Sequence, residues 1–154
     1  KLADAVNGKE VSFNLSHSGD WIALAFARGH RLGIDIERIR PEVNYDQIAQ
    51  RFFSVSEWRA LRVLPAPLRP SYFFRLWTCK EAYLKAIGQG LAFPLSQVEL
   101  GYRQPGVLEL LVTPSVPDAA RWRIEVVDID SGYAGALVVE PFAGAVRGFD
   151  WSWV

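Results

Sequence analysis

One long helix, preceded by prolines and followed by strand-like segments, constrains the fold more than any other feature. Three prolines between residues 65 and 70 interrupt regular structure, because proline lacks a backbone N–H and clashes with a preceding helical turn. A helix can begin at Pro70 or Ser71 and run to Ile87, with Gly88 as its C-terminal stop. It is the longest helix that the chain predicts.

The other segments predict strands and two shorter helices. Strand patterns occupy residues 11–16, 21–27, 32–37, 98–102, 107–113, 122–129 and 133–140, and helical patterns occupy residues 45–53 and 54–64. Ser54 and Glu57 have the spacing of a capping box, which opens the second of these helices. We therefore expect an α+β fold in which a meander of antiparallel strands packs on the long helix.

Composition limits the function classes. The formal net charge of the 154 residues is zero, whereas binding to nucleic acid or to an anionic membrane needs an excess of Lys and Arg. Cys79 is the only cysteine, so no internal disulfide can form. The longest apolar run, residues 21–27, cannot span a bilayer, and no signal peptide opens the chain. These features predict a cytoplasmic protein without nucleic-acid or membrane partners.

Two carboxylates lie two residues apart in the segment Gly33-Ile-Asp-Ile-Glu37. In a strand, Asp35 and Glu37 point to the same side and repel each other unless water or a cation neutralises them. Hard oxygen ligands of this kind suit Mg²⁺, which takes one or two carboxylates together with substrate phosphates. Taken alone, the motif is more typical of a solvated strand face than of a metal site.

A third carboxylate lies on the long helix. Steps of four residues bring Trp77, Glu81 and Lys85 onto one stripe, so that Glu81 can join a metal site and Lys85 can meet phosphate charge. Alternatively, Glu81 and Lys85 form an ordinary surface pair worth a few tenths of a kcal/mol.

A histidine flanked by hydroxyls follows the first predicted strand. Ser16, His17 and Ser18 offer donors that suit phosphate, and imidazole can also bind metal. A packed or surface histidine is the alternative. His30 lies in a predicted hairpin loop and receives no role.

The combination and order of these motifs resemble the Sfp-type (surfactin-synthetase-activating) phosphopantetheinyl transferases. The family's three motifs correspond here to Asn-Leu-Ser-His-Ser at residues 14–18, Gly-Ile-Asp-Ile-Glu at residues 33–37 and Trp-x-x-Lys-Glu-Ala-x-x-Lys at residues 77–85. Arg-Phe-Phe-Ser at residues 51–54 also resembles the family. The similarity extends from about residue 8 to about residue 140.

The resemblance implies a single chain of two similar α+β halves related by a pseudo-twofold axis, with coenzyme A bound between them. Residues 1–32 would end the first half and residues 33–154 would form the second. Most of the first half would be absent, and a segment encoded upstream or on another chain would supply it. Ser-Gly turns at residues 18–19 and 131–132, each leading into an Ala-rich strand, fit matching strands of two halves.

The resemblance also implies an activity, the transfer of 4′-phosphopantetheine from coenzyme A to a serine of an acyl or peptidyl carrier protein. Asp35, Glu37 and Glu81 would hold Mg²⁺ or Mn²⁺, with Glu81 and Lys85 catalytic. The residues implied to contact coenzyme A are Lys9, Ser16, His17, Lys80 and Lys85.

Two other classes of protein are alternatives to this one. A hydrolase built on Ser16, His17 or Cys79 lacks a Gly-x-Ser-x-Gly elbow. A non-catalytic domain that binds carrier proteins remains the alternative.

Overall fold

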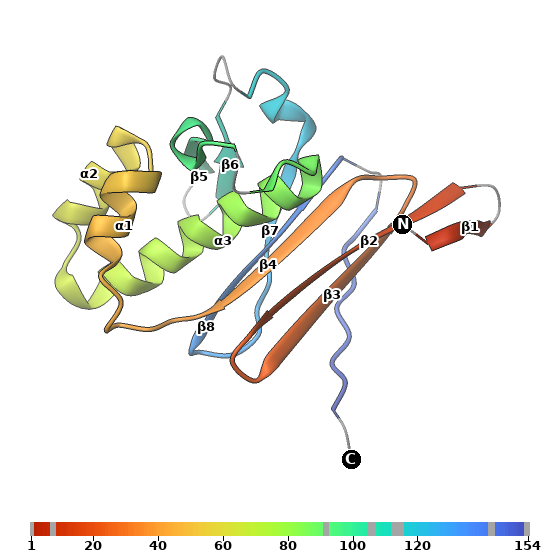
Figure 1. The fold of residues 1–154 in the computed structure, drawn as a ribbon, viewed down its shortest axis with the longest axis horizontal. Coiled ribbons are helices and arrows are strands. Elements are labelled where there is room, and N and C mark those ends of the chain that lie inside the picture. Colours follow the sequence, from red (N-terminus) through yellow and green to blue (C-terminus); the bar gives the residue numbers. More distant parts are fainter. Residues whose placement is uncertain are drawn as a thin grey trace.

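The computed structural model describes residues 2–6, 9–90, 93–104, 107–111, 116–141 and 144–152; side chains are described from residue 10 onward, except those of residues 103 and 104. Eight strands and three α-helices lie in these residues (Figure 1). The strands are β1 (Leu2–Val6), β2 (Lys9–Ser18), β3 (Trp21–Arg28), β4 (Leu32–Arg38), β5 (Leu100–Gln104), β6 (Val107–Leu110), β7 (Arg123–Val126) and β8 (Tyr133–Val139). The helices are α1 (Tyr45–Phe52), α2 (Val55–Val63) and α3 (Arg69–Ile87).

The helix ends follow from local chemistry. Helix α3 carries Pro70 in its first turn, where no intrahelical N–H bond is lost, and it ends at Gly88, whose φ of 71° is left-handed. The hydroxyl of Ser54 accepts a bond from the Glu57 backbone N–H, and the Glu57 carboxylate accepts one from the Ser54 N–H. The predicted long helix and the predicted capping box are therefore confirmed.

The strands form three antiparallel sheets, in the orders β1-β2-β3, β4-β8-β7 and β5-β6. Strand β4 pairs with β8, which is about a hundred residues away, with Asp35 opposite Ala136. The predicted α+β class is confirmed. The predicted meander of the last four strands is wrong, because β5 and β6 form a hairpin of their own while β7 and β8 extend the sheet of β4.

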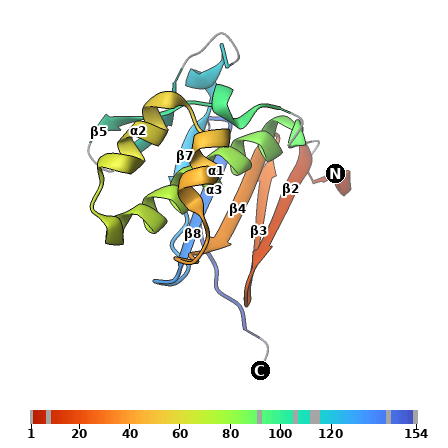
Figure 2. The ribbon, with the colours of Figure 1, turned by 60° about the vertical axis from the view of Figure 1, so that its left-hand side comes forward.

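Helix α3 lies directly across β4 and β8 (Figures 1 and 2). Gly33 permits this close approach, since a Cβ atom there would overlap the carbonyl oxygen of Ala82 and the amide nitrogen of Ala86. The main core lies around α3 and includes Leu76, Leu84 and Val138, all nearly inaccessible to solvent. Because strand residues alternate in direction, the face of β4 that carries Gly33 also carries its two carboxylates toward α3.

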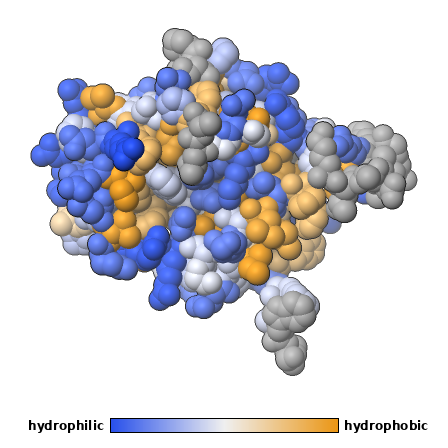
Figure 3. All heavy atoms as spheres, in the orientation of Figure 1, coloured by the Kyte–Doolittle hydropathy of each residue, from blue (hydrophilic) through white to orange (hydrophobic). Residues whose placement is uncertain are grey.

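The β2–β3 hairpin stands beside β4, on the side away from α1 and α2 (Figure 2). Its inner face carries small residues of β3 that pack on β4 and β8, namely Ala23, Ala25 and Ala27. Its outer face carries large apolar residues that are 44–68% exposed, namely Phe13, Leu15, Ile22, Leu24 and Phe26. Figure 3 shows an apolar patch over this hairpin. A hairpin with its larger apolar side chains outward presents an unusually large exposed apolar surface.

Candidate functional site

The three predicted carboxylates lie where α3 crosses β4. Asp35 and Glu37 project from β4 toward the helix, and Glu81 projects from α3 close enough for both of them to influence its ionisation. Lys85, one turn beyond Glu81, donates from Nζ to Asp35 Oδ1 at 2.8 Å and to the Ile34 carbonyl oxygen at 2.9 Å. The crossing therefore brings three carboxylates and one ammonium group together from two distant segments of the chain.

Two of these carboxyl groups are held in an environment that opposes their ionisation. Burial raises the pKa of Asp35, although Lys85 and Ser16 counteract the effect. Burial also raises the pKa of Glu81, and repulsion from Asp35 and Glu37 adds to it. Asp35 Oδ2 and Glu81 Oε1 are both buried and lack a hydrogen-bond partner within the described structure. Two orphaned carboxylate oxygens are the kind of group that a cation would satisfy.

The site is not a ready-made metal cage. Within the ranges that the structure describes, no three His, Cys, Asp or Glu side chains converge closely enough to hold a metal ion. Instead, Asp35 is paired with the Lys85 ammonium, while Glu37 Oε2 accepts a bond from the Ser18 hydroxyl at 2.9 Å. The donor set of Asp35, Glu37 and Glu81 has the hard oxygen chemistry that Mg²⁺ prefers.

The serine–histidine motif on β2 is divided between two faces of the strand. Ser16 is buried, and its hydroxyl donates to Asp35 Oδ1 at 2.9 Å while accepting the Ile36 N–H at 3.2 Å. The single hydrogen of this hydroxyl is therefore engaged within the protein, and the contact predicted between Ser16 and coenzyme A stays a prediction. His17 points the opposite way and is exposed on the outer face of the hairpin, beside Ile22. The phosphate contact predicted for His17 stays a prediction, and the side chain of Lys9 lies outside the described residues.

The predicted contact of Lys80 with coenzyme A gains no support from the position of this side chain. Its side chain is fully buried, and Nζ lies 2.7 Å from Glu57 Oε2 and donates to the carbonyl oxygens of Leu95 and Val98. Burial lowers the pKa of Lys80, whereas the Glu57 carboxylate opposes this change. Three acceptors take up the three ammonium hydrogens, so Lys80 joins α3 to α2 and to the segment before β5. Adjacent helix positions face different directions, which separates Lys80 from Glu81.

Cys79 is not a nucleophile in this structure. It is fully buried on α3, and burial raises the pKa of its thiol to about 12. A thiol that stays protonated and shielded from solvent is unreactive. This disfavours the hydrolase alternative.

The sequence reasoning missed two contacts between β2 and β4 beside the site, namely those of Asn14 and Ser18. Asn14 Oδ1 accepts the Ile34 N–H at 2.9 Å, and Ser18 Oγ accepts the Arg38 N–H at 3.0 Å. The available signal was a polar residue at every second position of a strand whose other face is apolar.

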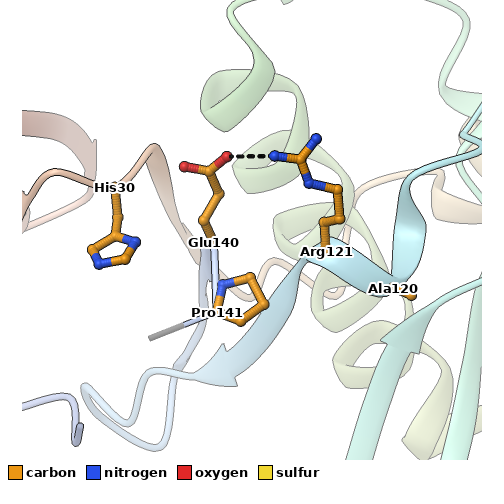
Figure 4. Close-up of a pocket in the computed structure, with 5 residues that line it drawn as sticks. All are labelled: His30, Ala120, Arg121, Glu140 and Pro141. Carbon is orange, nitrogen blue, oxygen red and sulfur yellow. Dashed lines mark ion pairs between the residues drawn. The ribbon is translucent and has the colours of Figure 1, made fainter. Parts of the chain in front are cut away.

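A shallow cavity of about 440 Å³ lies at the other end of β4, lined by His30, Ala120, Arg121, Glu140 and Pro141 (Figure 4). Glu140 already accepts two bonds from the Arg31 guanidinium and lies 3.6 Å from Arg121 Nη2. This cavity contains none of the predicted site residues. In the described part of the chain, no helix is long and apolar enough to cross a membrane.

The chain matches the family model described as the 4′-phosphopantetheinyl transferase superfamily over residues 31–138. The chain is 36% identical over 151 residues to the 4′-phosphopantetheinyl transferase HetI of Nostoc sp., which covers 97% of this chain and 57% of that protein. It is 34% identical over 129 residues to the 4′-phosphopantetheinyl transferase Sfp of Bacillus subtilis, covering 83% of this chain and 54% of that protein. The chain thus spans somewhat more than half the length of these curated relatives.

Two solved structures share the fold. The holo-[acyl-carrier-protein] synthase of Neisseria meningitidis superposes with a TM-score of 0.60 at 19% identity, covering 73% of this chain and 98% of that one. A holo-(acyl-carrier-protein) synthase from Bacillus anthracis in complex with CoA (3′,5′-ADP) gives a TM-score of 0.57 at 22% identity, covering 71% of this chain and 94% of that one.

Proposed function

The chain belongs to the 4′-phosphopantetheinyl transferase superfamily, and from this premise we propose that it transfers 4′-phosphopantetheine from coenzyme A to a serine of an acyl or peptidyl carrier protein. The observation that carries the proposal is the meeting of Asp35, Glu37 and Glu81 beside Lys85, where α3 crosses β4. This arrangement suits a reaction on a diphosphate, because carboxylates can hold a cation and an ammonium group can hold phosphate oxygens.

The oxygen chemistry of these residues fits a divalent cation, although the three carboxylates would have to move closer together to hold it. Asp35 Oδ2 and Glu81 Oε1 are buried without a partner, so a cation there would remove two unfavourable interactions at once. Asp35, Glu37 and Glu81 would hold Mg²⁺ or Mn²⁺. When bound, the ion supplies charge neutralisation for the diphosphate of coenzyme A and for the departing 3′,5′-ADP.

The side chains of this chain then have separate tasks. Glu81, whose pKa is raised by burial, is the base that takes the proton of the carrier-protein serine. The serine oxygen forms a bond to the β-phosphorus, the bond from that phosphorus to the oxygen of 3′,5′-ADP breaks, and the departing group keeps the electron pair. Lys85 makes two described bonds from an ammonium group with three hydrogens, which leaves one for a phosphate oxygen.

The outer face of the β2–β3 hairpin supports a further part of the proposal. Its exposed apolar residues, such as Leu24 and Phe26, fit a surface that is covered in the complete enzyme. We propose that the rest of the first half expected from the family resemblance packs on this hairpin, with coenzyme A between the halves.

A transfer assay tests the proposed function. The full-length protein is incubated with coenzyme A carrying a labelled pantetheine thiol, and with apo acyl or apo peptidyl carrier protein, in Mg²⁺ or in excess chelator. Label should reach the carrier serine only with metal, and a carrier whose acceptor serine is replaced by alanine should stay unlabelled. Binding of the carrier without any transfer would favour the non-catalytic alternative.

A further inference from the structure

Side chains of β2 accept hydrogen bonds from the backbone of β4 along the edge of β4 that faces β2. Strand β4 uses its other edge to pair with β8, and β2 belongs to a different sheet. The backbone N–H groups of Ile34, Ile36 and Arg38 are nevertheless satisfied, because they donate to side-chain oxygens of β2 at 2.9, 3.2 and 3.0 Å. These acceptors belong to Asn14, Ser16 and Ser18, which we call the β2 ladder. A buried N–H group left without an acceptor costs about 1–3 kcal/mol.

The type of each residue in the β2 ladder depends on which side chain of β4 lies beside it. Ser16 accepts the Ile36 N–H, and the side chain immediately before it, Asp35, receives the hydroxyl hydrogen. Ser18 accepts the Arg38 N–H, and the preceding side chain, Glu37, receives its hydrogen at 2.9 Å. A hydroxyl serves both purposes because one oxygen atom is acceptor and donor.

The third residue of the β2 ladder, Asn14, has no neighbouring carboxylate to which it could donate a hydrogen bond. Asn14 accepts the Ile34 N–H through Oδ1. The residue before Ile34 is Gly33, which has no side chain to receive a hydrogen. Serine thus stands at the two steps where a carboxylate precedes the N–H group, and asparagine stands where none does.

The chemistry of the bonded groups fixes the direction of each of these hydrogen bonds. A backbone N–H can only donate and an ionised carboxylate can only accept, so each serine hydrogen must point at its carboxylate. Each serine therefore ties one carboxylate oxygen to the backbone of the next residue on β4. In Asp35 this leaves Oδ2 as the oxygen without a described partner.

We propose that Ser16 and Ser18 are positioning residues that hold Asp35 and Glu37 for the divalent cation, and that they act through these carboxylates without contacting substrate. The inference rests on the proposed function, since it assumes that these carboxylates bind the cation. Groups that orient metal-binding side chains change metal affinity by about 10–100-fold when they are removed.

The test compares steps of the β2 ladder with and without a carboxylate. Ser18→Ala removes an N–H acceptor and a carboxylate donor, whereas the matched control Asn14→Ala removes only an N–H acceptor. Affinity for Mn²⁺ alone is measured by electron paramagnetic resonance on the full-length protein without coenzyme A, and thermal unfolding is measured alongside. Ser16→Ala is the second test variant, and Ser18→Thr restores a hydroxyl.

We expect Ser18→Ala and Ser16→Ala to weaken Mn²⁺ binding about tenfold or more. Asn14→Ala should lower only the unfolding temperature, and Ser18→Thr should recover most of the affinity. Equal Mn²⁺ affinity in Asn14→Ala and both serine variants would overturn the inference while leaving the proposed function intact. A wild type that binds no Mn²⁺ and transfers no label would overturn both. If one serine variant does not fold, the other decides.

Discussion

Replacing Glu81 by glutamine should stabilise the metal-free protein while it removes the activity. Glu81 Oε1 is buried without a described partner, and Asp35 and Glu37 repel the ionised group. An amide of the same shape carries no charge and can donate to these carboxylates. A buried group without a partner costs about 1–3 kcal/mol, and the partial exposure of Glu81 reduces this to about 1 kcal/mol.

For a protein of this size, about 1 kcal/mol corresponds to a rise of roughly 2–4 °C in Tm. The assay is thermal unfolding of wild type and Glu81→Gln, in excess chelator and in saturating Mg²⁺. Mg²⁺ at a hundredfold excess over its Kd stabilises a binding protein by about 2.7 kcal/mol, and this gain should be confined largely to wild type. The order of the two Tm values should therefore reverse between the two conditions.

The pH dependence of this difference follows from the raised pKa of Glu81. The folded state binds the proton of Glu81 more tightly than the unfolded state, in which the pKa is near its ordinary value of 4.5. Wild type therefore loses stability relative to Glu81→Gln as the pH rises from 4.5, the ordinary pKa, through the higher pKa that Glu81 has in the folded state. Below pH 4.5 the difference should vanish. Two results would refute the reasoning. One is a glutamine variant that is less stable than wild type in chelator at neutral pH, and the other is a rise in its Tm with Mg²⁺ as large as that of wild type.

Three further predictions concern separate parts of the structure. Lys85→Ala should reduce kcat about a hundredfold, with a smaller loss of coenzyme A binding. Lys85→Arg should recover only part of that kcat. An unchanged kcat in Lys85→Ala would contradict the catalytic role of Lys85. Lys80→Met should lower the free energy of unfolding in urea by about 3–5 kcal/mol, because it leaves the buried Glu57 carboxylate without a counter-charge. It should not change the coenzyme A affinity of the folded protein. Residues 1–154 alone should self-associate in analytical ultracentrifugation, and Ile22→Ser with Phe26→Ser should reduce this; a monodisperse wild type would argue against it.

Local patterns were enough to predict most of the helices and strands, although not β1, and to predict which candidate site residues share a face. Proline at the start and glycine at the end bounded the long helix, because their effects act on their own backbone positions. Alternation on residues 32–37 placed Asp35 and Glu37 on one face, and a step of four placed Lys85 one turn beyond Glu81. All of these relations span fewer than twenty residues of chain.

Relations between distant segments were decided only by tertiary packing. Nothing local shows that β4 pairs with β8 and not with β3, or that β5 and β6 leave the predicted meander. Lys80 illustrates the difference. Its motif matched a phosphate ligand, yet burial against Glu57 on another helix uses all its donors.

The serines of β2 show the same division at the site itself. Their spacing along the strand is visible in the sequence, because side chains alternate with a period of two residues. Their task depends on an unpaired edge of β4 that exists only after β4 has paired with β8. A hydrogen-bond donor requires a partner only once folding removes it from water, so that requirement is set by the three-dimensional structure.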